Sequence, residues 1–87
     1  MGQPEIFIYK TPTCPYCEMA IQYLESLGLK YTAFDLTKEP LKAQEMMQKS
    51  GQTSVPVIII AKDAKEQIIT GFNKPEIDSA LSVKNKQ

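Results

Sequence analysis

The chain has 87 residues, of which 43% are hydrophobic and 23% charged, so it is long enough for one compact domain and too apolar for a disordered tail. Ten basic residues balance ten acidic residues, and this neutrality gives no field that would favour nucleic acid or an anionic membrane. The longest apolar run, "VPVIIIA", is far below the roughly 20 residues of a membrane span, and we expect a soluble cytoplasmic protein with a single domain over residues 1–87.

The first third of the chain predicts a strand, a helix and a second strand. Residues 5–9, "EIFIY", are β-branched and aromatic, which is typical of a strand buried on both faces. Pro15 suits the first turn of the following helix, and Gly28 suits its C-terminal cap. The apolar residues of this helix recur at steps of three and four: Cys17, Ala20, Ile21, Leu24 and Leu27. "KYTAFDL", residues 30–36, then reads as a strand parallel to the first, joined by a right-handed crossover.

A second helix is predicted within residues 37–51, "TKEPLKAQEMMQKSG". Thr37 can cap its N-terminus, Pro40 is tolerated in its first turn and Gly51 can end it. Its apolar stripe would come from Leu41, Met46 and Met47, with the methionines filling the core.

The last part of the chain predicts a hairpin and a short third helix. "VPVIII" and "EQIIT" are β-rich runs joined by "AKDAK", a length that suits two antiparallel strands. Asn73 and Glu76 have the spacing of a capping box, and Ile77, Ala80 and Leu81 continue at helical steps. The complete order is therefore β-α-β-α-β-β-α, which predicts an α/β fold with one four-stranded mixed sheet flanked by three helices.

Both cysteines of the chain lie in "TCPYC", residues 13–17. If Cys14 occupies the N-cap of the first helix, the unpaired N–H groups and the positive end of the helix favour its thiolate over its thiol. Lys10, at the end of the first strand, could add a positive charge. Cys17 lies one turn further on, on the apolar face, and should be less ionised. This asymmetry predicts that Cys14 attacks a substrate disulfide and that Cys17 then displaces the product by closing a Cys14–Cys17 bond.

The two cysteines also fit other roles. A structural disulfide across so short a loop would constrain the unfolded chain little, and a structural zinc site needs four Cys or His ligands where this chain has two cysteines and no histidine. A Cu(I)-binding carrier that uses both thiolates stays open as the non-enzymatic alternative.

Three stretches, "YKTPTCPYC", "SGQTSVPVIII" and "GFNKPEIDSAL", together resemble the glutaredoxin family, including its small bacterial glutaredoxin-like and NrdH-like branches. The resemblance implies a thioredoxin-like fold and thiol-disulfide oxidoreductase activity, with Cys14 as the nucleophile and Cys17 as the resolving thiol. It also implies that the peptide bond between Val55 and Pro56 is cis and faces the cysteines.

The resemblance further implies glutathione as co-substrate, disulfide-containing proteins as substrates, and a monomer with no bound cofactor or metal. An iron-sulfur cluster shared by two monomers is disfavoured by the rigid Pro15. The implied residues for binding substrate or glutathione are Lys10, Pro15, Tyr16, Gln52, Ser54, Val55, Pro56, Gly71, Phe72 and Asn73. Phe72 departs from the Gly-Gly of many glutathione users and is closer to NrdH-like redoxins, which take electrons from thioredoxin reductase and donate them to ribonucleotide reductase. Those redoxins usually lack the CPYC centre.

Overall fold

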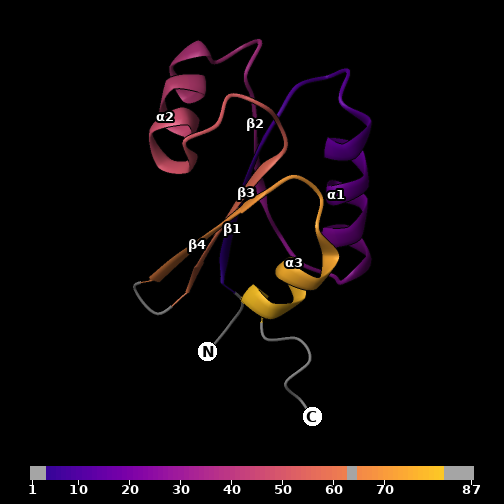
Figure 1. Cartoon of the computed structure of the whole chain (residues 1–87). Helices are drawn as coiled ribbons and strands as arrows, with labels where there is room; N and C mark the ends of the chain where they lie inside the picture. The colour runs from indigo at the N-terminus through magenta and orange to yellow at the C-terminus, as the bar shows by residue number, and fades with distance from the viewer. Residues whose placement is uncertain (1–3, 63–64, 82–87) are drawn as a thin grey trace.

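The elements of the computed structural model follow one another along the chain in the predicted order (Figure 1). The structure describes residues 4–62 and 65–81. Its elements are β1 (Glu5–Lys10), α1 (Pro15–Ser26), β2 (Thr32–Asp35), α2 (Pro40–Ser50), β3 (Val57–Lys62), β4 (Lys65–Thr70) and α3 (Lys74–Leu81). Among these described residues, no helix is both long enough and apolar enough to cross a membrane.

The four strands form one mixed sheet in the order β2-β1-β3-β4. β1 runs parallel to β2 and antiparallel to β3, while β3 and β4 form the antiparallel pair predicted from "VPVIII" and "EQIIT". The connecting residues 63–64 of that pair lie outside the described residues. The two central strands, β1 and β3, are the most apolar, because each must bury side chains on both faces of the sheet.

Side chains on successive strand residues enter two different cores, one on each face of the sheet. α1 and α3 cover one face and α2 covers the other (Figure 1). The core under α1 and α3 contains Ile6, Ile8, Ala20, Leu24, Ile58, Ile60, Ile69, Ile77, Ala80 and Leu81. The core under α2 contains Tyr9, Met46, Val57 and Ile59. The expectation that the first strand is buried on both faces is therefore confirmed.

The predicted start of the second helix was wrong. The helix begins at Pro40, after Glu39. Thr37 does not cap it, because both the backbone N–H and the hydroxyl of Thr37 donate to Asp35 Oδ1, at 2.9 and 2.6 Å. The carboxylate closes a tight turn at the end of β2 that contains Thr37, and the N-cap position falls two residues later, at Glu39, which makes no side-chain capping bond. β2 is accordingly shorter than the run 30–36 suggested.

The predicted apolar stripe of α2 was only partly correct. Met46 is buried against the sheet, but Leu41 is 77% exposed and Met47 is 47% exposed. Met46 is the residue of α2 in the core beneath it, and Leu41, in the first turn of α2, lies outside that core. Met47 follows Met46 directly, and neighbouring residues of a helix point about 100° apart, so both cannot face the same core.

The third helix is capped as the sequence predicts. The backbone N–H of Glu76 donates to Asn73 Oδ1 at 3.2 Å, and α3 starts at the following residue, Lys74. At the same end of the hairpin, where Val57 pairs with Thr70, the strand bounds differ slightly from the prediction: β3 starts at Val57, because Pro56 has no N–H to contribute to a ladder.

Candidate active site

Cys14 is the N-cap residue of α1. Its backbone is extended, with φ −103° and ψ 106°, and its sulfur accepts a hydrogen bond from the backbone N–H of Cys17 at 3.1 Å. Pro15 occupies the first turn, where a missing N–H leaves no bond unmade. The sulfur of Cys14 therefore lies at the positive end of the helix dipole and satisfies one of the unpaired N–H groups there.

Cys17 lies one turn inside α1 and is fully buried. Burial raises the pKa of its thiol above the ordinary value of 9.0, and the hydrogen bond with Cys14 raises it further. A backbone hydrogen bond with Thr11 and the charge of Lys10 act in the opposite direction, but burial outweighs them. The two sulfurs thus occupy different environments, one at an electropositive helix end and one in the apolar interior.

The segment before β3 lies directly beside Cys14. The sulfur of Cys14 donates to the carbonyl oxygen of Val55 at 3.9 Å, and the Val55–Pro56 peptide bond is cis, as the family resemblance implies. The backbone N–H of Gly71 donates to the carbonyl of Pro56 at 2.8 Å, so the turn after β4 is tied to the same place. Gly71 has φ 80°, a conformation that favours glycine. The tertiary structure thus brings together three distant segments of the sequence.

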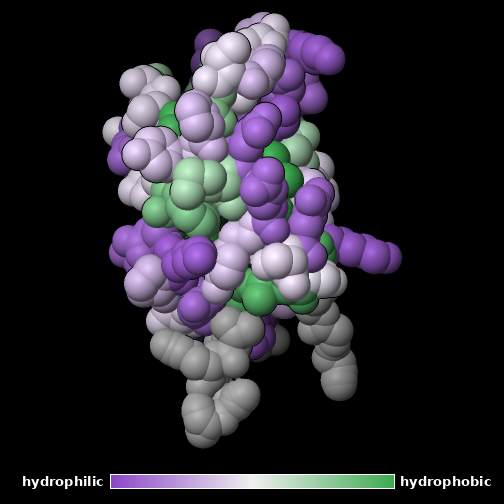
Figure 2. All heavy atoms as spheres, turned by 90° about the vertical axis from the view of Figure 1, so that its right-hand side faces the viewer, coloured by the Kyte–Doolittle hydropathy of each residue, from purple (hydrophilic) through white to green (hydrophobic). Residues whose placement is uncertain are grey.

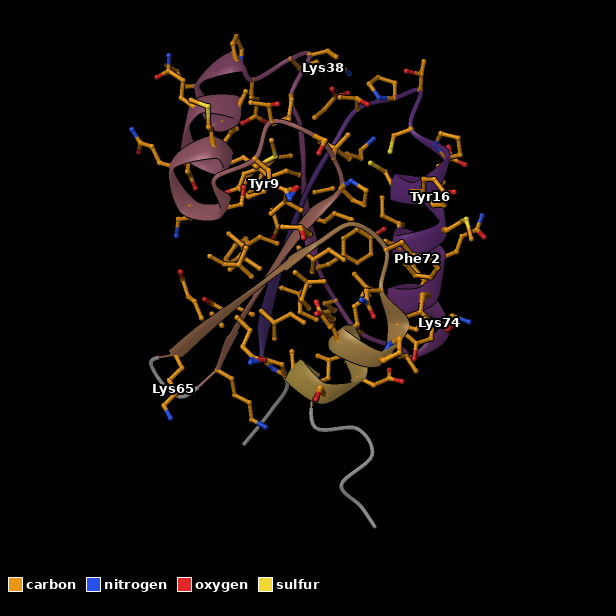
Figure 3. All side chains as sticks on the ribbon, in the orientation of Figure 1. Tyr9, Tyr16, Lys38, Lys65, Phe72 and Lys74 are labelled. Atoms are coloured by element: carbon orange, nitrogen blue, oxygen red, sulfur yellow. The ribbon has the colours of Figure 1, made fainter. Side chains whose placement is uncertain are left out.

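Tyr16, Phe72 and Lys74 follow one another along the α1 side of the molecule (Figure 3). Tyr16 is 61% exposed. Phe72 is partly buried and meets the ring of Tyr23 edge to face, with centroids 6.2 Å apart. The Lys74 Nζ lies 5.1 Å from the Tyr23 ring centre, and the Tyr23 hydroxyl donates to Asp78. Phe72 therefore packs against the core and also forms part of the surface along α1.

The sequence did not single out Tyr23, Lys74 or Met19 as site residues. Together with Gln22 and Phe72 they line a shallow hollow of about 280 Å³. The face that carries α1 is mostly polar with a few apolar groups between (Figure 2). The sequence did carry a signal for two of these residues, because Met19 and Tyr23 are four residues apart and therefore share one side of α1.

The remaining predicted binding residues lie in less connected positions. Gln52 and Ser54 belong to the segment after α2, where the Ser54 hydroxyl donates to the Gln52 side chain at 3.4 Å. Asn73 is engaged in capping α3. Lys10 is half-buried at the end of β1. None of the contacts in the described residues joins Gln52, Ser54 or Asn73 to Cys14.

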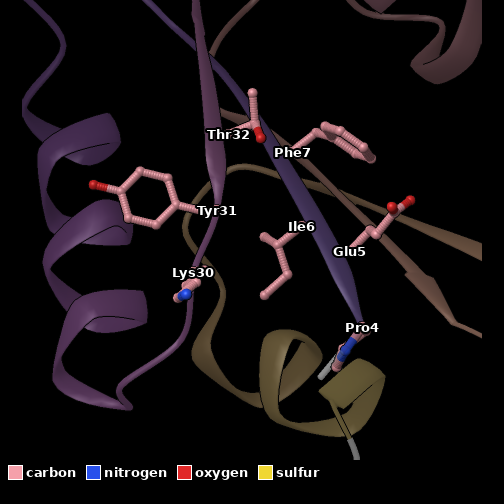
Figure 4. Close-up of a pocket in the computed structure, with 7 residues that line it drawn as sticks. All are labelled: Pro4, Glu5, Ile6, Phe7, Lys30, Tyr31 and Thr32. Atoms are coloured by element: carbon pink, nitrogen blue, oxygen red, sulfur yellow. The ribbon is translucent and has the colours of Figure 1, made fainter. Parts of the chain in front are cut away.

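Two further features bear on the chemistry. Within residues 4–62 and 65–81, no group of three or more His, Cys, Asp or Glu side chains is placed to hold a metal ion. A second hollow, of about 260 Å³, lies at the start of β1 and is lined by residues from Pro4 to Phe7 and from Lys30 to Thr32 (Figure 4). The cysteines follow the opposite end of β1, so this hollow is separate from them.

The raised pKa of Cys17 predicts a pH dependence of stability. Because the unfolded chain loses this proton near pH 9.0 and the folded chain only at higher pH, the contribution is complete below pH 9 and declines as pH rises above it. We expect the free energy of unfolding of the reduced protein, measured with urea, to fall by up to about 1.4 kcal/mol per pH unit there from this group. Cys17→Ala is the control, since Tyr9 and Tyr23 titrate in both proteins. Parallel curves for the two proteins would contradict the prediction.

Comparison with known proteins places these observations in a family. The family model named Glutaredoxin matches residues 6–64. The glutaredoxin-like 8.6 kDa protein in the rubredoxin operon of Clostridium pasteurianum is 40% identical over 76 residues, covering 87% of this chain and 96% of that protein. Glutaredoxin 3 of Escherichia coli K12 is 40% identical over 53 residues, covering 61% of this chain and 64% of that protein.

Solved structures show the same architecture. A thioredoxin-like protein superposes with a TM-score of 0.79 at 23% identity, covering 91% of this chain and 96% of that chain. The glutaredoxin-like NrdH-redoxin from Escherichia coli superposes with a TM-score of 0.70 at 25% identity, covering 86% of this chain and 92% of that chain. The fold is therefore thioredoxin-like, which confirms the expectation from the sequence.

Proposed function

The chain belongs to the glutaredoxin family, and on that premise we propose that it is a thiol-disulfide oxidoreductase that works through Cys14 and Cys17. The observation that carries the proposal is the pair of unequal sulfurs: Cys14 caps α1 and is partly accessible, and Cys17 is buried one turn away. A nucleophile must reach its substrate, whereas a resolving thiol needs only to reach the first sulfur.

The proposed reaction has two steps. The Cys14 thiolate attacks one sulfur of a substrate disulfide, the substrate S–S bond breaks, and one substrate thiolate leaves. The Cys17 thiol then loses its proton to solvent, and its sulfur attacks Cys14 to release the second substrate thiolate. The substrate gains two electrons and the protein is oxidised to a Cys14–Cys17 disulfide. We propose the carbonyl of Val55, 3.9 Å from the Cys14 sulfur, as an acceptor for the backbone N–H of a bound peptide.

Glutathione is the reductant that we propose for the oxidised protein. Lys10 and the exposed Tyr16 flank the cysteines and offer a positive charge and an apolar surface to a small anionic thiol. A first glutathione would open the Cys14–Cys17 disulfide to a mixed disulfide, and a second would release it as glutathione disulfide. The two free cysteines, which must be reduced again after each turnover, fit the reducing cytoplasm.

One observation favours a second donor. Phe72 occupies the position where many glutathione users have glycine, and in the structure its ring packs against Tyr23 and takes up part of the surface beside α1. The fold is also similar to that of the glutaredoxin-like NrdH-redoxin of Escherichia coli, whose structure is described as the basis of a thioredoxin-like activity profile. The alternative is therefore a redoxin that thioredoxin reductase reduces and that delivers its electrons to ribonucleotide reductase.

Two coupled assays separate the donors. The oxidised protein is incubated with glutathione, glutathione reductase and NADPH, and separately with thioredoxin reductase and NADPH, and NADPH consumption is followed by absorbance. We expect turnover with glutathione, because the charged and apolar groups around Cys14 suit it. Cys14→Ser serves as the blank in both assays. Turnover with thioredoxin reductase alone would support the NrdH-like alternative, and no turnover in either assay would contradict both assignments.

A further inference from the structure

A hollow of about 250 Å³ lies beside the resolving cysteine, and Lys10, Thr11, Cys17, Glu18 and Glu25 are among the residues that line it. Cys17 itself is fully buried, so this hollow brings open space next to a residue that solvent does not reach directly. Cys14 is not among the lining residues. The two-step reaction described above gives this hollow no role.

The position of Lys10 in this hollow follows from the register of the sheet. Ile6 and Ile8 of β1 point into the core under α1, and Lys10 is the next residue of the same strand on that side. Its partner in β2 is Asp35, which faces the same way because Phe34 belongs to the opposite core. The charge of Lys10 contributes to lowering the pKa of the Asp35 carboxyl, after the larger effect of the Thr37 hydrogen bond. Lys10 therefore lies between β2 and α1, on the side of Cys17.

Four influences act on the thiol of Cys17 besides its burial. The hydrogen bond with Cys14 and the charge of Cys14 both oppose its ionisation, whereas the backbone of Thr11 and the charge of Lys10 both favour it. The two opposing influences depend on a free Cys14 sulfur. When Cys14 enters a mixed disulfide it is neutral and uncharged, and these two influences end. Lys10 and Thr11 are unaffected by that step and continue to favour the thiolate.

We propose that Lys10 is a positioning residue for the second step: from the hollow beside Cys17 it stabilises the Cys17 thiolate once Cys14 is bound to substrate. The proposal rests on the proposed two-cysteine function. The hollow gives the proton of Cys17 a path to solvent, the freed electron pair forms the S–S bond to Cys14, and the bond from Cys14 to the substrate sulfur breaks. Glu18 and Glu25 also line the hollow, and Asp35 pairs with Lys10 across β1 and β2, so Lys10 is the positive group among the residues that line this space.

The test uses 2,2′-dithiodipyridine, a neutral disulfide, so that no charge on the reagent is drawn to Lys10. Attack by Cys14 releases one thiopyridone in a phase whose rate depends on reagent concentration. Attack by Cys17 releases a second in a phase that does not, and stopped-flow absorbance follows both in the intact protein. The variants are Lys10→Gln, Lys10→Arg, which keeps the charge, and Lys38→Gln, which removes an exposed lysine on the β2–α2 connection outside the hollow (Figure 3).

We expect Lys10→Gln to raise the pH midpoint of the second phase by roughly one unit, the lower end of the effect of one nearby opposite charge. The rate of that phase at neutral pH should then fall by up to about tenfold, since one pH unit is a tenfold change in thiolate. Lys10→Arg should restore the midpoint, and Lys38→Gln should leave it unchanged. Circular dichroism verifies that each variant is folded.

An unchanged midpoint in folded Lys10→Gln would overturn the role of Lys10, as would equal shifts in Lys38→Gln. If Lys10→Gln failed to fold, Lys10→Met would replace it as the uncharged variant and would be compared with Lys10→Arg, which is charged. Equal pH midpoints in these two variants would overturn the proposal. Wild-type protein that released only one thiopyridone would instead contradict the two-cysteine function itself. The two failures are therefore distinguishable in one experiment.

Discussion

Replacement of Cys14 by serine is expected to abolish the reduction of disulfides, with a loss of roughly three orders of magnitude or more, the scale seen when an enzyme loses its nucleophile. A serine hydroxyl stays protonated at neutral pH, and the end of α1 is too weak an influence to ionise it. The measurement is the rate of deglutathionylation of a mixed disulfide between glutathione and a cysteine peptide, coupled to glutathione reductase.

Cys17→Ser is the matched control for this prediction, because it changes the same atom one turn away. With Cys14 intact, the first step should proceed and the mixed disulfide should accumulate, which mass spectrometry of the protein detects. Reduction of a protein disulfide should then stop after one step. A fully active Cys14→Ser protein, or a Cys17→Ser protein that forms no mixed disulfide, would reverse the roles proposed for the two cysteines.

Truncation of Leu24 should produce the largest loss of stability among the residues of α1. Leu24 is fully buried between α1 and the sheet, in the core that also contains Ile8 and Ile77. Leu24→Ala removes the buried methyl groups and leaves a cavity, and we expect the free energy of unfolding to fall by about 2–5 kcal/mol. Small domains are stable by only about 5–15 kcal/mol, so this substitution should remove a large share of the free energy of unfolding.

Leu41→Ala provides the control for this measurement. It is the same substitution in another helix, at a leucine that is 77% exposed, and its effect should be within about 0.5 kcal/mol. Urea unfolding of both variants, followed by circular dichroism, gives the comparison. Losses of equal size would mean that α1 does not depend on the core beneath it. Because α1 carries both cysteines, the Leu24 variant should also lose activity at lower urea concentrations than wild type.

Local patterns in the sequence were sufficient to predict the helices and strands and to identify the two cysteines of the site. The continuous apolar runs in "EIFIY" and "VIII" and the three- and four-residue steps of α1 depend only on how a strand or a helix presents its side chains, so they predict the elements without knowledge of what each packs against. Cys14 at an N-cap and Asn73 three residues before Glu76 are likewise short-range relations, and both appear in the structure. The element order and the parallel and antiparallel pairings followed from these segments.

Relations between distant residues were decided by the tertiary structure. Thr37 bonds Asp35 in the turn before the second helix, and Leu41 and Met47 face solvent because the side of α2 that meets the sheet carries Met46, Glu45 and Lys42. The contact of Phe72 with Tyr23 and the approach of Lys10 to Cys17 both need the sheet register and the packing of α1. A sequence determines which residues can be buried, from their chemistry and spacing. Which of them meet is determined by the shape that the whole chain adopts, because each face of this sheet has room for only a few side chains.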